Sequence, residues 1–212
     1  PFDKGAYASS TTYISGTAAV NAAKICAERI KVRAAMMRNR SSKVETFESS
    51  QVALANRFAV FPDGEKIPFT EIALDSLHKN NQEQIMGVAS YVSPVSPPPF
   101  AAQFAEVTVD VEAGAVTVDR LVMAVDSGVI VNPLTASGQI EGGMTQALGY
   151  AVCEEMRYDE KGNAIERDLD RYHIFRADEM PALETIFVET FEPSHPFGVK
   201  AVAEIPMDGV AP

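Results

Sequence analysis

Apolar residues near the start of the chain recur at intervals of three and four positions, which is the spacing of one face of an α-helix. The pattern runs from Gly16 to Met37 and predicts a long amphipathic helix over these residues. Its apolar positions are Val20, Ala23, Ala27, Ile30, Ala34 and Met37. The stretch from Lys24 to Arg40 is the most basic part of the sequence, and we expect its charges to form a solvated face of this helix.

Shorter elements are predicted between this helix and the middle of the chain. Residues 51–62 have the pattern of a strand pair followed by a turn at Asp63-Gly64, and a helix is expected from Pro68 to about Lys79. Residues 92–99 contain four prolines, and because proline cannot donate a backbone hydrogen bond they predict an extended connection. One domain over residues 1–212 is therefore expected, with a possible division into 1–95 and 96–212.

Strict alternation of apolar and polar residues follows this connection. The stretch Ala105–Glu112 predicts a half-buried strand, Gly114 a turn, and residues 116–125 the returning strand of a hairpin. A helix is predicted from Gly138 to Glu155 and a further strand over 185–190. Four glycines in that helix indicate close packing against another backbone or a bulky ligand, since each costs roughly 1 kcal/mol relative to alanine.

These elements predict an α+β fold, in which mixed and antiparallel sheets are flanked by helices. Strict alternation of strands and helices is missing, and so is the glycine-rich turn of dinucleotide-binding domains, so a doubly wound parallel sheet is not expected. The apolar runs are only a few residues long, and we expect no membrane span. No signal peptide is visible, and the expected location is the cytoplasm.

Charge and cysteine content narrow the classes of function. With 29 acidic and 18 basic residues the net charge is −11, which disfavours binding to nucleic acid. The two cysteines, Cys26 and Cys153, cannot hold an iron–sulfur cluster or a usual zinc site, and the three histidines lack the spacing of metal ligands. We therefore expect no metal ligand from the protein itself, so any metal must arrive bound to another molecule.

Three segments carry more polar and small residues than folding alone requires. They are the Ser/Thr-rich stretch Gly5–Thr12, the glycine- and glutamine-containing helix from Gly138, and the small-residue loop 197–209 around Glu204. Each offers backbone N–H groups or neutral amides, which suits a large anionic organic cofactor. Each segment taken singly also has a plain structural interpretation. The Ser/Thr-rich stretch could be a helix N-cap, Gln139 a solvated helix position and Glu204 a surface carboxylate.

The residues of these segments and their order along the chain resemble a known family. The stretch Asp126–Leu134 followed by Gly138–Gly143, the loop Gly198–Pro206 and the opening stretch Ala8–Gly16 are similar to the molybdenum subunits of the xanthine dehydrogenase and aldehyde oxidase family. The matches follow the family's order and span nearly the whole chain. The chain is thus identified as the C-terminal half of that family's molybdenum-cofactor-binding region.

The resemblance implies a molybdopterin cofactor, in its cytosine dinucleotide form, that holds molybdenum through a dithiolene. It implies that Glu204 is the catalytic base that takes a proton from a molybdenum-bound hydroxyl, so that water supplies the oxygen for hydroxylation of a purine-like or other nitrogen heterocycle. The cofactor-binding residues that it implies are Gln139, Gly142, Gly143, Ala8, Ser9, Thr11, Lys200, Ala201, Val202 and Ala203.

The resemblance also implies partners. The preceding half of the molybdenum region, in the same chain or as a separate subunit, would complete the cofactor site, and a [2Fe-2S] subunit and an FAD subunit would carry electrons away. We therefore expect the chain to be a fragment or a split subunit that is inactive alone. An aldehyde oxidoreductase of the same family is one alternative, and a catalytically silent assembly module is another, although retention of both Glu204 and Gln139 speaks against the latter.

Overall fold

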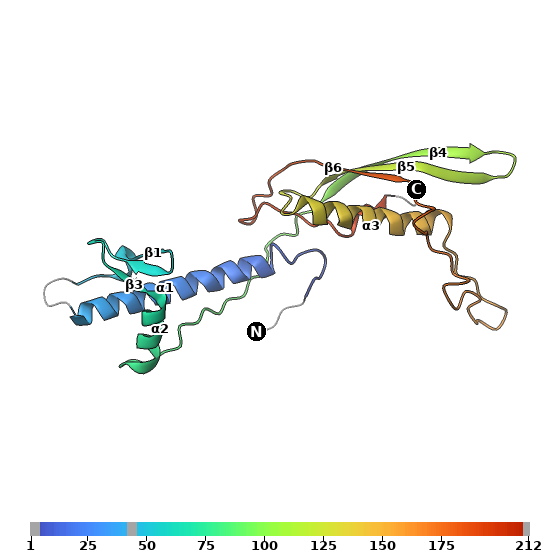
Figure 1. Cartoon of the computed structure of the whole chain (residues 1–212). Coiled ribbons are helices and arrows are strands. Elements are labelled where there is room, and N and C mark those ends of the chain that lie inside the picture. Colours follow the sequence, from blue (N-terminus) through green and yellow to red (C-terminus); the bar gives the residue numbers. More distant parts are fainter. Residues whose placement is uncertain (1–4, 42–45, 210–212) are drawn as a thin grey trace. The chain divides into compact units, whose positions relative to one another are not determined.

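The computed structural model describes residues 5–41 and 46–209, which form two compact units. The helical unit comprises Ile14–Val92, and the sheet unit comprises Pro1–Tyr13 together with Ser93–Pro212 (Figure 1). The division at residues 92 and 93 falls at the start of the proline-rich connection, whereas the first thirteen residues belong with the C-terminal part. Contacts with the C-terminal part explain this division. The Ser9 hydroxyl accepts a hydrogen bond from the Ala203 N–H, and the Tyr13 ring stacks on His195.

The helical unit contains a long helix, a small sheet and a second helix. Its elements are α1 (Ser15–Ser41), a 3-10 turn η1 (Ser49–Gln51), β1 (Ala53–Ala55), β2 (Phe58–Val60), β3 (Lys66–Pro68) and α2 (Phe69–His78). The three strands pair antiparallel in the order β1-β2-β3. The predicted long helix, strand pair, turn at Gly64 and second helix are therefore confirmed.

The core of the helical unit corrects one expectation about α1. Ala34 and Ala35 of this helix pack with Phe61 and Ile72 in the buried cluster. Arg33, in the middle of the basic stretch, is fully buried and not part of a solvated face. Its guanidinium donates to the Asp75 carboxylate and to the backbone carbonyls of Asp75 and Asn81, and these partners allow a charge to remain in the interior.

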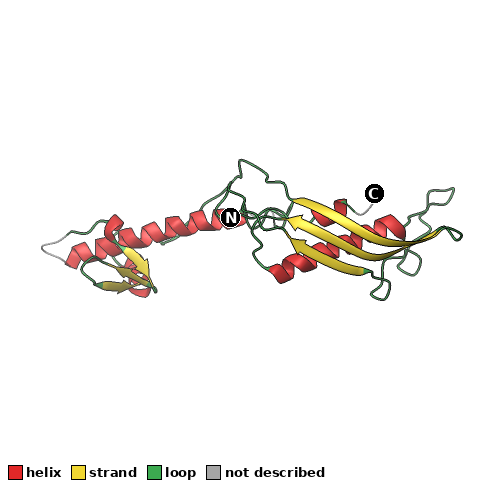
Figure 2. Ribbon diagram, turned by 90° about the horizontal axis from the view of Figure 1, so that it is seen from above, coloured by secondary structure: helices red, strands yellow, loops and turns green. Residues whose placement is uncertain are grey.

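The sheet unit is built on a long hairpin covered by a helix. Its elements are β4 (Phe100–Asp110), β5 (Ala115–Asp126), α3 (Pro133–Val152), β6 (Ala182–Phe187) and the short helix α4 (Ile205–Asp208). β4 pairs antiparallel with β5, and β5 pairs parallel with β6, so that the sheet is mixed in the order β4-β5-β6. Figure 2 shows α3 lying along one face of this sheet. The predicted hairpin and the predicted fold class are confirmed.

The hydrophobic core of the sheet unit lies between β5 and α3. Leu121, Met123 and Val125 of the strand pack with Ile140, Met144 and Leu148 of the helix. The expectation that the first strand of the hairpin is half-buried is wrong, because Val107 and Val109 are 50% and 53% exposed. The buried positions of β5 begin only at Leu121, so the outer half of the hairpin extends beyond this core.

Helix α3 begins five residues earlier than the glycine pattern indicates. Asn132 caps it by accepting a hydrogen bond from the Thr135 N–H, and Pro133 occupies the first helical position, where a missing N–H costs nothing. Gly143 packs against Pro206, which confirms the predicted close packing for this glycine. Gly138 and Gly142, in contrast, face open space. Each helix in the described part of the chain is too short or too polar to cross a membrane.

Candidate functional site

The loop that carries Glu204 is fastened to the segment that follows β5. The Val129 N–H donates to the Gly198 carbonyl at 2.9 Å, and the Lys200 N–H donates to the Ser127 carbonyl at 2.7 Å. The two backbones approach closely because Gly128 has no side chain and a φ of 68°. A Cβ on this glycine would lie 2.3 Å from the Gly198 oxygen. The sequence therefore uses glycine here to fix the start of the loop.

An ion pair between Lys200 and Asp126 adds a second attachment. The Nζ atom of Lys200 lies 2.8 Å from Oδ2 of Asp126, and it also lies over the Phe100 ring. Burial raises the pKa of Asp126, but hydrogen bonds from Lys200, the Thr190 hydroxyl and the Gly128 N–H outweigh it and leave that pKa below its ordinary value. The lysine ammonium is thus paired with a structural carboxylate, just as the Lys200 N–H is paired with the Ser127 carbonyl.

A buried histidine supports the same loop from another side. The Nε2 atom of His195 lies 2.7 Å from the Val199 carbonyl oxygen, and its Nδ1 accepts from the Phe197 N–H at 3.4 Å, which corresponds to a neutral ring with its proton on Nε2. The ring stacks on Tyr13 with centroids 5.2 Å apart, and both side chains are buried. Tyr13 directly follows the Ser/Thr-rich stretch Gly5–Thr12, so this contact joins that stretch to the loop of Glu204.

The Ser/Thr-rich stretch forms a tight turn beside Glu204. The Ser10 N–H donates to the Tyr7 carbonyl at 3.0 Å, and the two central residues, Ala8 and Ser9, have φ values of 47° and 52°. Positive φ at both central positions defines a type I′ turn, which is usually occupied by glycine or asparagine. The turn presents the Ser9 hydroxyl to Glu204, whose Oε2 lies 3.3 Å away.

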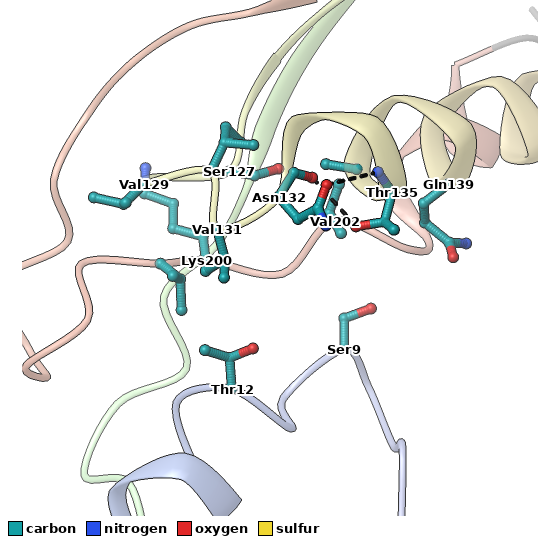
Figure 3. A pocket seen from close by; sticks show the side chains of 13 residues that line it. Ser9, Thr12, Ser127, Val129, Val131, Asn132, Thr135, Gln139, Lys200 and Val202 are labelled. Atoms are coloured by element: carbon teal, nitrogen blue, oxygen red, sulfur yellow. Dashed lines mark hydrogen bonds between the residues drawn. The ribbon is translucent and has the colours of Figure 1, made fainter.

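A cavity of about 360 Å³ opens between this turn and the N-terminal end of α3 (Figure 3). The buried Ser127 hydroxyl lines it and has no hydrogen-bond partner among the described residues. The remaining polar groups are neutral hydroxyls and amides, apart from the paired Lys200. The lining residues are Ser9, Thr12, Ser127, Val129, Ile130, Val131, Asn132, Thr135, Ala136, Gln139, Val199, Lys200 and Val202.

Four of the predicted cofactor-binding residues line this cavity: Ser9, Gln139, Lys200 and Val202. Figure 3 shows the Gln139 side chain leaving α3 on the side where Ser9 lies. Ala203 and Glu204 lie next to the cavity, because the Ala203 N–H donates to the Ser9 hydroxyl at 3.1 Å and Glu204 accepts from it.

The other predicted residues lie elsewhere in the sheet unit. Ala8 and Thr11 are exposed on the N-terminal stretch, and Ala201 is half-buried in the loop. Gly142 is exposed on α3, and Gly143 is covered by Pro206. None of these five is among the residues that line the cavity in the described part of the chain.

The segment between β5 and α3 was missing from the predicted site. Ser127, Ile130 and Asn132 line the cavity. The stretch that contains them has the glycine and proline of ordinary turns, and for that reason the sequence predicted only turns there. The signal that could have found them is the family resemblance of the stretch Asp126–Leu134, which includes all three. Among residues 5–41 and 46–209, no group of three His, Cys, Asp or Glu side chains could hold a metal ion.

Comparison with known proteins agrees with this geometry. A family model described as "Molybdopterin cofactor-binding domain" matches residues 1–181. The chain belongs to this family. It is 34% identical over 213 residues to the xanthine dehydrogenase molybdenum-binding subunit of Escherichia coli O157:H7, and 32% identical over 216 residues to the carbon monoxide dehydrogenase large chain of Afipia carboxidovorans. Both matches cover 100% of this chain, including the loop of Glu204, which lies beyond the family model.

Solved structures of the family share the fold. The Cu,Mo-CO dehydrogenase matches with a TM-score of 0.77 and 28% identity over 100% of this chain, and quinoline 2-oxidoreductase from Pseudomonas putida 86 with 0.72 and 25% over 97%. The chain spans only about a quarter of these relatives, namely 28% of the E. coli subunit and 26% of the Afipia chain and of each of the two solved chains. These relatives include the molybdenum-binding subunit of a xanthine dehydrogenase and the Cu,Mo-CO dehydrogenase, and this chain is a molybdopterin cofactor-binding domain.

Proposed function

We propose that this chain forms one wall of the cofactor site of a molybdenum hydroxylase and supplies Glu204 as the catalytic base. The observation that carries the proposal is the convergence of three distant segments on one cavity. Ser9 from the N-terminal turn, Gln139 from α3 and Lys200 from the C-terminal loop all line it, and Glu204 accepts a hydrogen bond from Ser9.

The lining of the cavity fits a pyranopterin dinucleotide. Such a cofactor presents ring nitrogens, amino and carbonyl groups and phosphates, and it needs many neutral donors and acceptors. Gln139, Ser9 and the Ser127 hydroxyl, which is unpartnered among the described residues, would hold the pterin edges. The volume of about 360 Å³ is within the range of ligand sites. We infer the cytosine dinucleotide form, which the resemblance to the family implies.

Glu204 lies at the edge of this site, beside Ser9, and in this proposal it moves a proton there. When bound, the cofactor supplies a Lewis acid that activates water and an acceptor for two electrons. The exposed Glu204 carboxylate would serve as the general base and accept a proton there. The loop attachments at Gly198, Val199 and Lys200 hold its backbone in place, so that proton transfer does not depend on ordering a free loop.

The site is completed by partners in this proposal. The preceding half of the molybdenum region closes the cavity, and a [2Fe-2S] subunit and an FAD subunit receive the electrons, in a cytoplasmic complex. The relatives named as a molybdenum-binding subunit and a large chain support this view, because both names describe one part of an assembly. We propose a purine-like or other nitrogen heterocycle as the substrate, in keeping with the xanthine dehydrogenase subunits among the relatives.

Elemental mass spectrometry of the purified complex tests the assignment of cofactor. We expect about one molybdenum per copy of this chain, together with release of a cytidine nucleotide on acid hydrolysis. The same complex from cells unable to make the cofactor is the control, and it should contain neither. Absence of molybdenum from the complex made in competent cells would reject the proposal and leave an assembly module.

A further inference from the structure

The turn that carries Ser9 holds an unfavourable backbone conformation. Ala8 and Ser9 both have positive φ, although neither is glycine or asparagine. Left-handed conformations cost an alanine or serine on the order of 1 kcal/mol each and persist only where surrounding contacts enforce them. The turn is therefore maintained by its contacts, and among them are those of the Ser9 hydroxyl.

The Ser9 hydroxyl lies between two groups of the loop that carries Glu204. Its oxygen accepts a hydrogen bond from the Ala203 N–H at 3.1 Å, and its proton is donated to Oε2 of Glu204 at 3.3 Å. In the part of the chain that the structure describes, Ser9 is the one hydrogen-bond partner of this carboxylate. The Ala203 N–H thus orients the serine, and the serine orients the acid.

We propose that Ser9 is a positioning residue for Glu204, and that it fixes one carboxylate oxygen. Donation to Oε2 restricts an exposed side chain that otherwise rotates freely, and it leaves Oε1 to receive the proton. The catalytic meaning of this inference rests on the proposed function of Glu204.

Carbodiimide labelling of Glu204 in the molybdenum-loaded complex tests this inference without a substrate. The rate of labelling is measured at one fixed pH and assigned to residue 204 by mass spectrometry, with Glu204→Gln as the blank. The test variants are Ser9→Ala and Ser9→Gly, which both lack the hydroxyl. Glycine also relieves the strain at positive φ, so a folding defect in the alanine variant does not prevent the measurement.

The matched control is Ser10→Ala. Ser10 donates its hydroxyl to the Tyr7 carbonyl in the same turn, but its hydroxyl is bonded to neither Ala203 nor Glu204. Both Ser9 variants should raise the labelling rate of Glu204 by roughly threefold, because the carboxylate is released from its hydrogen bond, while Ser10→Ala keeps the wild-type rate.

A labelling rate in both Ser9 variants equal to that of wild type would overturn the positioning role, as would an equal rise in Ser10→Ala. The proposed function is judged separately, from turnover of Glu204→Gln in the same preparations. If that variant keeps turnover, Glu204 is not the base, whatever Ser9 does to the labelling.

Discussion

Lys200 and Asp126 form a largely buried ion pair that joins the end of β5 to the loop of Glu204. Their side chains are only 10% and 17% exposed, and Nζ and Oδ2 lie 2.8 Å apart. The two residues are 74 positions apart in the sequence. The ion pair and the backbone hydrogen bonds beside it hold the loop in place at Lys200, three residues before Ala203.

Replacing Lys200 by methionine should destabilise the sheet unit. The substitution leaves the Asp126 carboxylate buried without its cation, which costs roughly 2–3 kcal/mol. Hydrogen exchange of the β5 amides in the complex measures the loss, with Lys161→Met, at an exposed position of the same unit, as the control for charge. Equal protection in both variants would show that the pair adds nothing to stability.

The same pair predicts a pH dependence. The folded-state pKa of Asp126 lies below its ordinary value of 3.8, so the ionised carboxylate stabilises the folded state above that pH. This contribution is lost as the pH falls below 3.8 and through the lower folded value. The free energy of unfolding from urea titrations should therefore decline less steeply with falling pH in Asp126→Asn than in wild type. An unchanged slope would contradict the assignment.

Gly128 and Gly114 allow backbone strain to be separated from close packing. Their φ values are 68° and 66°, but a Cβ at Gly128 would meet the Gly198 oxygen, whereas one at Gly114 would meet open space. Alanine at Gly114 should cost about 1 kcal/mol from φ alone, and alanine at Gly128 at least twice that. Urea unfolding measures both, and equal losses would mean that the approach of the two backbones is unimportant.

Arg33 offers a test in the helical unit. Methionine at this position leaves Asp75 and a backbone carbonyl without the buried guanidinium, and we expect a loss of about 3 kcal/mol in the free energy of unfolding. Arg29→Met, on an exposed position of the same helix, should change it by less than about 0.5 kcal/mol. A loss at Arg33 no larger than that at Arg29 would show that the buried network is not stabilising.

Local pattern predicted the elements well, because each follows from the spacing of apolar residues or from turn chemistry. The helix over Gly16–Met37 and the hairpin around Gly114 depend on neighbours in the sequence, and both are present. Burial was predicted less well. Arg33 is buried because Asp75 reaches it, and Val109 is exposed because it lies beyond α3, and neither fact can be derived from spacing.

The site depends on contacts between residues that are far apart in the sequence, and this limits what a single sequence reveals. The hydrogen bond between Ser9 and Glu204 spans 195 positions, and nothing in either local stretch predicts it. Resemblance to a family directed attention to both residues. It did not show that the Lys200 ammonium is occupied by Asp126, which only the geometry reveals.

The central claim is that Glu204 is the base of a molybdenum site, and the Glu204→Gln variant of the full complex tests it most directly. Molybdenum content and turnover on a panel of purines and other nitrogen heterocycles are measured in the same preparation. We expect wild-type molybdenum content and a loss of turnover of about a hundredfold or more, because the amide keeps the shape but cannot accept the proton. Wild-type turnover with full molybdenum content would contradict the account.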